Sequence, residues 1–131
     1  MSRFDAADPA ARRKLFTAAV SAHRERASEF CTFEPASAPP GSDEALVPWI
    51  QFGARTVSMD CTDAELERLK TLVDDYPDFR IADLQRPETA EGTHARVSSR
   101  SDANRLAGFI DEAFRQVFDY PEDYRVWVAA I

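Results

Sequence analysis

The stretch that decides the fold runs from His94 to Ile131 and reads HARVSSRSDANRLAGFIDEAFRQVFDYPEDYRVWVAAI. Polar residues alternate with small or apolar ones over 94–100, which is typical of a half-buried strand. Beyond Asp102, apolar residues recur at helical spacing and predict an amphipathic helix of about four turns. These residues are Leu106, Phe109, Ile110, Ala113, Phe114, Val117 and Phe118. The helix is expected to end at Asp119-Tyr120-Pro121, and 124–128 follows as a strand.

An earlier part of the chain repeats this order. A strand over 56–61 leads into a helix over 63–75, which a capping box of Thr62 and Glu65 opens. That helix ends at Asp75-Tyr76-Pro77, and a strand over 79–85 follows. Two successive strand–helix–strand halves predict an α+β fold for 56–131. We expect a ferredoxin-like plait (βαββαβ), with a four-stranded antiparallel sheet and two helices on one face. An open meander with added helices is the alternative.

Residues 1–55 are predicted to extend this core within one structural domain, which is the default for a chain of 131 residues. A helix is expected over 9–31, with Asp8 as its N-cap and Pro9 at its first position. Its apolar stripe must be buried, while charged residues such as Arg12 lie mostly on the other faces.

A proline-rich loop is predicted over 34–44, followed by a short extended segment over 46–52. Pro48 lacks the amide hydrogen that a central strand needs, so this segment is expected at a sheet edge or as the start of a strand.

The composition describes an acidic chain with very little lysine. The formal net charge is −7, and the sequence holds 14 arginines but only two lysines. An acidic surface disfavours nonspecific binding to nucleic acids or anionic membranes. Acid excess with scarce lysine suits a salt-adapted cytoplasm. No leader-like apolar segment and no span for a membrane is found, so we expect a soluble cytoplasmic protein with reduced Cys31 and Cys61.

Several pieces of the chain resemble a family of small uncharacterised haloarchaeal proteins. They are Val47-Pro48-Trp49-Ile50-Gln51-Phe52, Asp60-Cys61-Thr62-Asp63-Ala64-Glu65-Leu66, Ala90-Glu91-Gly92-Thr93 and Tyr124-Arg125-Val126-Trp127-Val128-Ala129-Ala130-Ile131. The resemblance spans nearly the whole chain. It implies an archaeal, halophilic, cytoplasmic protein and carries no activity or site residue across.

No catalytic, metal or cofactor motif is present. The two histidines, His23 and His94, lie on different predicted elements, and neither belongs to a metal-binding pattern. Cys61 precedes a helix N-terminus, where a thiol can be activated, but its alternation with Val57 and Met59 favours a buried small hydrophobe. No glycine-rich phosphate loop occurs. We therefore expect no metal and no cofactor.

The predicted sheet has one polar face, and that face is the candidate site. Helices should cover the apolar sets Val57/Met59, Phe79/Ile81, Ala95/Val97 and Val126/Val128. The opposite face then carries Thr56, Ser58, Asp60 and Ser98, together with the predicted ligand-binding residues Arg96, Arg100, Arg125, Trp127, His94 and Arg80. Arginines and an aromatic ring on a sheet suit an anionic small molecule or single-stranded RNA. Arg96 and Trp127 are expected roughly 10 Å apart.

The favoured function is a non-catalytic binding or regulatory module that uses this face. One alternative is a small-molecule enzyme with its site between the face and the N-terminal helix, for which His94 and Asp60 are the acid–base candidates. Another is a self-associating structural protein, such as a homodimer. The alternative to ligand binding is that the face is covered, by the first helix, by the Trp49 segment or by a second copy of the chain.

Salt should stabilise the fold. We expect the melting temperature to rise between dilute buffer and molar KCl, because fixed negative charges repel at low ionic strength and salt screens them. Thermal denaturation followed by circular dichroism over a KCl series measures this. A melting temperature that stays flat across the series contradicts salt adaptation.

Overall fold

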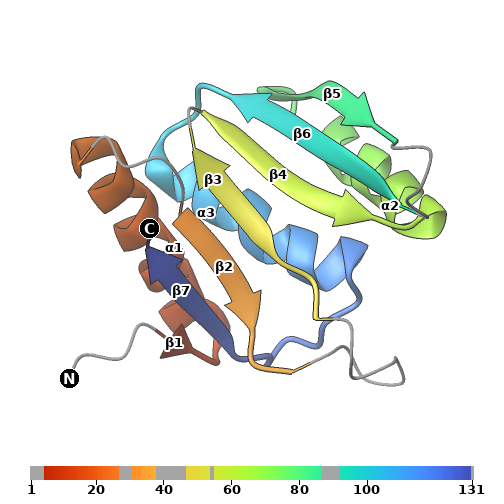
Figure 1. The fold of residues 1–131 in the computed structure, drawn as a ribbon. Helices are drawn as coiled ribbons and strands as arrows, with labels where there is room; N and C mark the ends of the chain where they lie inside the picture. The colour runs from red at the N-terminus through yellow and green to blue at the C-terminus, as the bar shows by residue number, and fades with distance from the viewer. Residues whose placement is uncertain (1–4, 27–30, 38–46, 54, 87–91, 131) are drawn as a thin grey trace.

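The computed structural model describes residues 5–26, 31–37, 47–53, 55–86 and 92–130. Within these ranges, seven strands form one antiparallel sheet, and three α-helices lie together on one side of it (Figure 1). The strands are β1 (Asp5–Ala6), β2 (Cys31–Pro35), β3 (Ile50–Gly53), β4 (Thr56–Cys61), β5 (Phe79–Gln85), β6 (Thr93–Ser99) and β7 (Val126–Ala130). The helices are α1 (Pro9–Arg26), α2 (Asp63–Asp74) and α3 (Ala103–Glu112), which continues into a π-helical turn, η1 (Ala113–Val117).

The predicted order of elements from β4 to β7 is confirmed. β4, α2, β5, β6, α3 and β7 follow one another, and β6 lies between β4 and β5 in the sheet. Thr62 caps α2 through the predicted capping box with Glu65. Asp102 caps α3 by accepting a hydrogen bond from the amide of Arg105 at 2.9 Å. Local signals therefore position both helix starts.

The prediction of a four-stranded ferredoxin-like plait is wrong. The strand order is β1-β7-β2-β3-β4-β6-β5, so β2 and β3 lie between β7 and β4, where a plait has direct neighbours. The physical reason is that every second side chain of β2 and β3 is apolar and must be buried against the same helices as the rest of the sheet. Cys31, Phe33, Ile50 and Phe52 are all at most 3% exposed. Inserting both strands into the sheet buries that apolar face.

The predictions for the N-terminal part hold only in part. Asp8 caps α1 by accepting from the amide of Ala11 at 2.9 Å, as expected. The helix is shorter than predicted, because Cys31 already belongs to β2, which also takes the start of the expected loop. The segment around Pro48 is not at a sheet edge. Pro48 precedes β3, so the missing amide hydrogen removes no bond from this interior strand.

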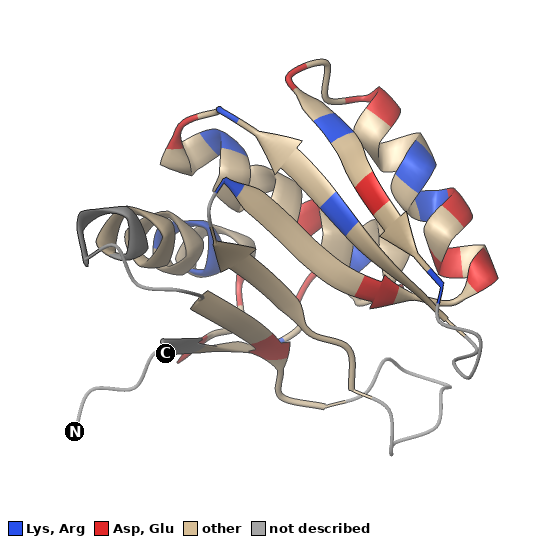
Figure 2. Cartoon of the chain, turned by 45° about the horizontal axis from the view of Figure 1, so that its top comes forward, with Lys and Arg blue, Asp and Glu red and all other residues tan. Residues whose placement is uncertain are grey.

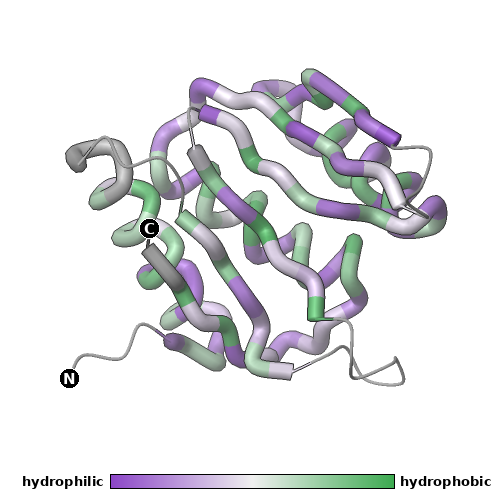
Figure 3. Tube along the Cα trace, viewed as in Figure 1, coloured by the Kyte–Doolittle hydropathy of each residue, from purple (hydrophilic) through white to green (hydrophobic). Residues whose placement is uncertain are grey.

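The core fills the space between the sheet and the helices. Strands alternate hydrophobic and hydrophilic residues along their length (Figure 3), and the hydrophobic sets predicted to face the helices are the buried or half-buried ones. The predicted helix core is confirmed, since Phe109, Ile110, Phe114 and Val117 are fully buried. Phe16 of α1 packs edge-on against Phe33 of β2, with ring centroids 5.0 Å apart. The N-terminal helix is therefore part of the same helical layer.

A buried ion pair joins α1 to α3. Arg12, which the sequence pattern placed on a solvent-facing side, is fully buried, because its guanidinium reaches Asp111 of α3 and the carbonyl of Tyr124, two residues before β7. Its Nε donates to Oδ1 of Asp111 at 2.8 Å, and the hydroxyl of Tyr124 donates to the same oxygen at 2.8 Å. Nη1 of Arg12 donates to the carbonyls of Ala7 and Tyr124, each at 3.0 Å. The guanidinium also lies 4.0 Å from the centre of the Tyr124 ring.

The third helix does not stay α-helical to Phe118 as predicted. Its last turn widens into η1, and the chain then leaves through Asp119 with φ of 62°. Arg68 of α2 donates through Nε and Nη2 to the carbonyl of Val117, at 3.0 and 2.8 Å. That donation satisfies a carbonyl that a helix end leaves without an internal partner.

Replacing Arg12 with methionine should destabilise the protein strongly. The change leaves the Asp111 carboxylate buried without its positive partner. Breaking a buried pair in this way costs roughly 3–5 kcal/mol, and we expect the free energy of unfolding to fall by that amount. Urea denaturation measures it.

The matched control is Lys14→Met on the same helix, where Lys14 is exposed. We expect this change to stay within about 0.5 kcal/mol of the parent protein. Combining Arg12→Met with Asp111→Leu should recover part of the loss, because no charge then remains unpaired. Equal effects of Arg12→Met and Lys14→Met would show that the pair contributes little.

Candidate anion-binding site

One face of the sheet carries none of the described helices. α1, α2 and α3 all lie on the other side, so the alternative in which the N-terminal helix covers the polar face does not hold (Figure 1). The segment at Trp49 does not cover the face either, because it leads into β3 within the sheet. Basic positions lie on β5 and β6, among strands that carry few charges (Figure 2). The described part of the chain thus leaves a polar surface open.

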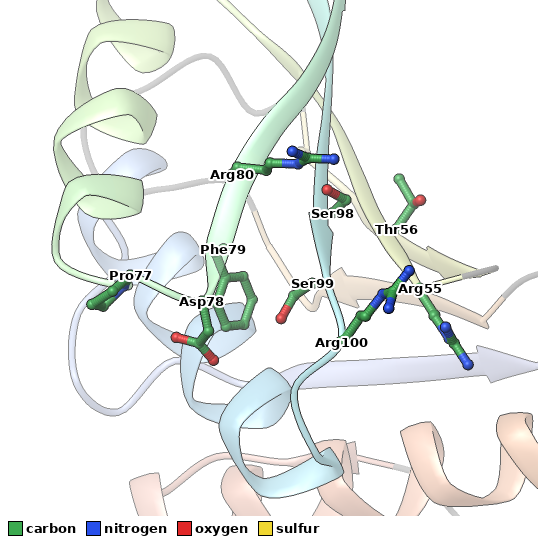
Figure 4. A pocket seen from close by; sticks show the side chains of 9 residues that line it. All are labelled: Arg55, Thr56, Pro77, Asp78, Phe79, Arg80, Ser98, Ser99 and Arg100. Carbon is green, nitrogen blue, oxygen red and sulfur yellow. The ribbon is translucent and has the colours of Figure 1, made fainter.

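A pocket of about 480 Å³ lies at one end of this face. It forms where β4 and β5 begin and β6 ends, and Figure 4 shows its side chains. Its lining comprises Arg55, Thr56, Pro77, Asp78, Phe79, Arg80, Ser98, Ser99 and Arg100.

Strand register places a hydroxyl row across the pocket. Arg80 of β5 pairs with Ser98 of β6, and Ser98 pairs with Thr56 of β4. Residues paired across strands share a face, so the Arg80 guanidinium and the two hydroxyl groups lie together (Figure 4). Hydroxyl groups and guanidinium N–H groups all donate hydrogen bonds to anions.

Two further arginines come from the chain next to the strands. Arg100 follows β6, and Arg55 precedes β4, and both line the same pocket (Figure 4). The carbonyl of Arg55 accepts a hydrogen bond from the amide of Ser99 at 3.1 Å, which holds this turn against the end of β6. Within the described ranges, Arg55, Arg80 and Arg100 make no ion pair and no side-chain hydrogen bond.

Arg55 adopts an unusual backbone conformation. Its φ is 62°, in the left-handed region that glycine or asparagine normally occupies at a hairpin turn. A long side chain costs free energy at such a position. Strain of this kind concentrates at sites where the side chain has a function.

The acidic residue of the pocket is already engaged. Asp78 accepts hydrogen bonds from the Ser101 hydroxyl and from Nη2 of Arg105, the latter at 3.1 Å. Both hydrogen bonds lower the pKa of Asp78, and the one from Ser101 has the larger effect. Arg105 lies outside the lining and balances this carboxylate, so the charges of Arg55, Arg80 and Arg100 dominate the pocket. Three arginines that line one pocket suit a phosphate or carboxylate group.

The six residues predicted to bind a ligand do not form one patch. Arg80 and Arg100 line the pocket, and Arg96 lies further along the same face of β6. Arg125 and Trp127 lie on β7 or beside it, near the opposite edge, where Arg125 pairs with Asp5. The predicted spacing of roughly 10 Å between Arg96 and Trp127 is wrong. Four steps of about 4.8 Å between strands separate them, roughly 19 Å, because β2 and β3 intervene.

His94 forms a second cluster at the other end of β6. Its Nδ1 lies 2.8 Å from Oδ1 of Asp60 on β4, so the two residues named as acid–base candidates do meet. The ring of Trp49 lies beside the imidazole, with centroids 6.2 Å apart and planes inclined by 40°. A site between this face and α1, as the enzyme alternative requires, does not form within the described ranges, because the sheet separates them.

A family model matches residues 1–131 over their whole length. The chain belongs to DUF7975, a family of unknown function. No curated protein matches this DUF7975 chain, and no solved structure does. The resemblance to a family of uncharacterised proteins is thus supported, while a haloarchaeal origin stays a prediction.

Sequence reasoning missed Arg55. The signal was the tripeptide Gly53-Ala54-Arg55 between two predicted strands, which indicated a hairpin but not a side chain turned toward the polar face. Alternation did place Thr56 and Ser98 on that face, and the pocket contains both.

Neither a metal-binding cluster nor a helix that could span a membrane occurs among the described residues. Among the residues the structure describes, no group of three or more histidine, cysteine, aspartate or glutamate side chains could hold a metal ion. His23 lies in α1, and its side chain is outside the described part of the chain. No described helix has the length and apolar character needed to cross a bilayer.

Both cysteines should resist labelling in the folded protein. Cys31 and Cys61 are at most 3% exposed, and burial raises the thiol pKa to about 11 and about 12. Each thiol is therefore protonated near pH 8, and the thiolate is the reactive form. We expect iodoacetamide to modify neither cysteine until urea unfolds the chain, as followed by mass spectrometry. Rapid modification of native Cys61 would restore it as a candidate nucleophile.

Proposed function

We propose that this protein is a non-catalytic cytoplasmic binding or regulatory module that holds an anionic small molecule. The phosphate or carboxylate group of the ligand occupies the pocket between Arg55, Arg80 and Arg100. The observation that carries the proposal is that these three arginines, which lack ion-pair partners in the described ranges, all line one pocket of about 480 Å³. The protein has a net charge of −7, so positive charge concentrated at one end of the open face favours anion binding there.

The geometry favours a small molecule over single-stranded RNA. An RNA site needs aromatic rings interleaved with basic residues along a groove, and Trp127 lies near the far edge of the sheet. Carboxylates also interrupt the face. Asp60 and Glu34 alternate with buried residues and are exposed, and a bulge after Ile81 brings Asp83 opposite Arg96. Their negative charge repels a continuous phosphate backbone but leaves a single anion at the pocket undisturbed.

The pocket is built for binding rather than turnover. The lining holds no histidine, and its one carboxylate, that of Asp78, is engaged by Ser101 and Arg105, so the lining offers no general base for a nucleophile. His94 lies four residues along β6 from Ser98, about 13 Å away.

Binding of pyrophosphate tests the proposal. We expect calorimetric titration of the parent protein to give saturable binding at constant ionic strength. Arg80→Gln with Arg100→Gln should weaken it by at least about tenfold, because each charge-assisted hydrogen bond contributes ~1.5–3 kcal/mol. Arg115→Gln is the matched control, since Arg115 is exposed on η1, away from the pocket. Arg115→Gln should bind as the parent does.

Arg55→Gly separates binding from folding. Glycine adopts a φ of 62° without strain, so this variant should melt at or above the parent temperature. It should nonetheless lose pyrophosphate affinity by about tenfold through the lost guanidinium. Absence of binding in the parent protein, or equal binding by Arg115→Gln and the Arg80/Arg100 double variant, would contradict the proposal.

A further inference from the structure

The open face of β6 connects the arginine pocket to the His94 cluster. His94, Arg96 and Ser98 occupy alternate positions of this strand and therefore share one face. Ser98 lies in the pocket, and His94 lies beside Trp49 and Asp60. Arg96, between them, is exposed and makes no ion pair with any described residue. One strand thus lines up an anion pocket, a central positive charge and a pair of rings.

The rings at the far end offer a flat surface for stacking. Trp49 and His94 are both only half-buried, so part of each side chain is open to solvent. A carboxylate only accepts hydrogen bonds, so the Nδ1 atom of His94 donates to Asp60, and this bond fixes the orientation of the imidazole. The two rings are therefore held in place before any ligand arrives.

The spacing of the two ends selects the length of the ligand. Four residues of extended strand separate His94 from Ser98, about 13 Å. A lone phosphate cannot span that distance. A nucleoside diphosphate spans it when its phosphates, ribose and base lie in line.

We propose that the arginine pocket and the Trp49–His94 pair are the two ends of one site for a free nucleoside diphosphate. The proposal rests on the anion site proposed above and adds the class of its ligand. Both phosphates lie at the pocket lined by Arg55, Arg80 and Arg100, and Arg96, which lies opposite Asp83, meets the ribose. The base stacks on Trp49 and His94, and Asp60 holds the His94 ring for it.

A free nucleotide fits the face better than a nucleotide within RNA. An RNA chain would continue from the ribose 3′-oxygen over this face, which also carries the exposed carboxylates of Asp60 and Glu34.

Tryptophan fluorescence can report the base directly. The chain has two tryptophans, so Trp127→Phe leaves Trp49 as the single reporter. We expect ADP, GDP, CDP or UDP to quench the emission of this variant saturably, whereas pyrophosphate binds without quenching. Calorimetry on the same samples gives the affinities.

Substitutions at Trp49 then separate the two ends. Trp49→Leu should weaken binding of the preferred nucleoside diphosphate by about tenfold and leave pyrophosphate binding unchanged. Trp49→Phe keeps a ring and should retain most of the affinity. Arg80→Gln with Arg100→Gln should weaken both ligands. Melting curves confirm that each variant is folded before it is compared.

The outcomes distinguish the two proposals. If pyrophosphate binds but none of the four nucleotides depends on Trp49, the nucleotide inference is overturned and the anion site stands. If neither pyrophosphate nor any nucleotide binds, both fail. A short single-stranded RNA that binds more tightly than every free nucleotide would also overturn the inference, because the site would then serve a polymer.

Discussion

A guanidinium and a carboxylate buried together, those of Arg12 and Asp111, hold the helical layer in place. The pair joins α1 to α3, and Tyr124 adds a hydroxyl and a carbonyl from the segment that enters β7. Charges buried this deeply are costly without partners, so α1 is held where Nε and Nη1 of Arg12 have acceptors, although Nη2 has none among the described residues. That position is behind the sheet. The opposite face stays open because the first helix is held on the other side.

Along β6, the open face carries different chemical groups at its two ends. Strand alternation sends every second residue of β6 to the core and the others outward. The outward ones meet different neighbours, with Arg80 and Thr56 at one end and Asp60 at the other. The outward face of β6 therefore connects a positive pocket at one end with a polar aromatic cluster at the other. The acidic surface elsewhere keeps these arginines from acting as a general polyanion site.

Sequence patterns predicted the features that depend on residues close together in the chain. Alternation assigned the faces of β4, β5, β6 and β7, and the capping box at Thr62 gave the start of α2. Strand pairing was beyond reach, because nothing near Cys31–Pro35 says that it lies between β3 and β7. That error carried over to the site, since it placed Trp127 next to Arg96. Burial of Arg12 was missed for the same reason, as its partner is 99 residues away in the sequence.

Insertion of β2 and β3 also has a consequence for how the chain is made. β2 pairs on one side with β3 and on the other with β7, and β7 is the last of the strands to be synthesised. Until Val126–Ala130 has left the ribosome, β2 exposes a row of unpaired amide and carbonyl groups, which is a template for pairing with other chains. Contacts between such distant segments also make a fold slow to complete. A nascent chain of this protein is therefore prone to aggregation through β2 until β7 pairs with that strand.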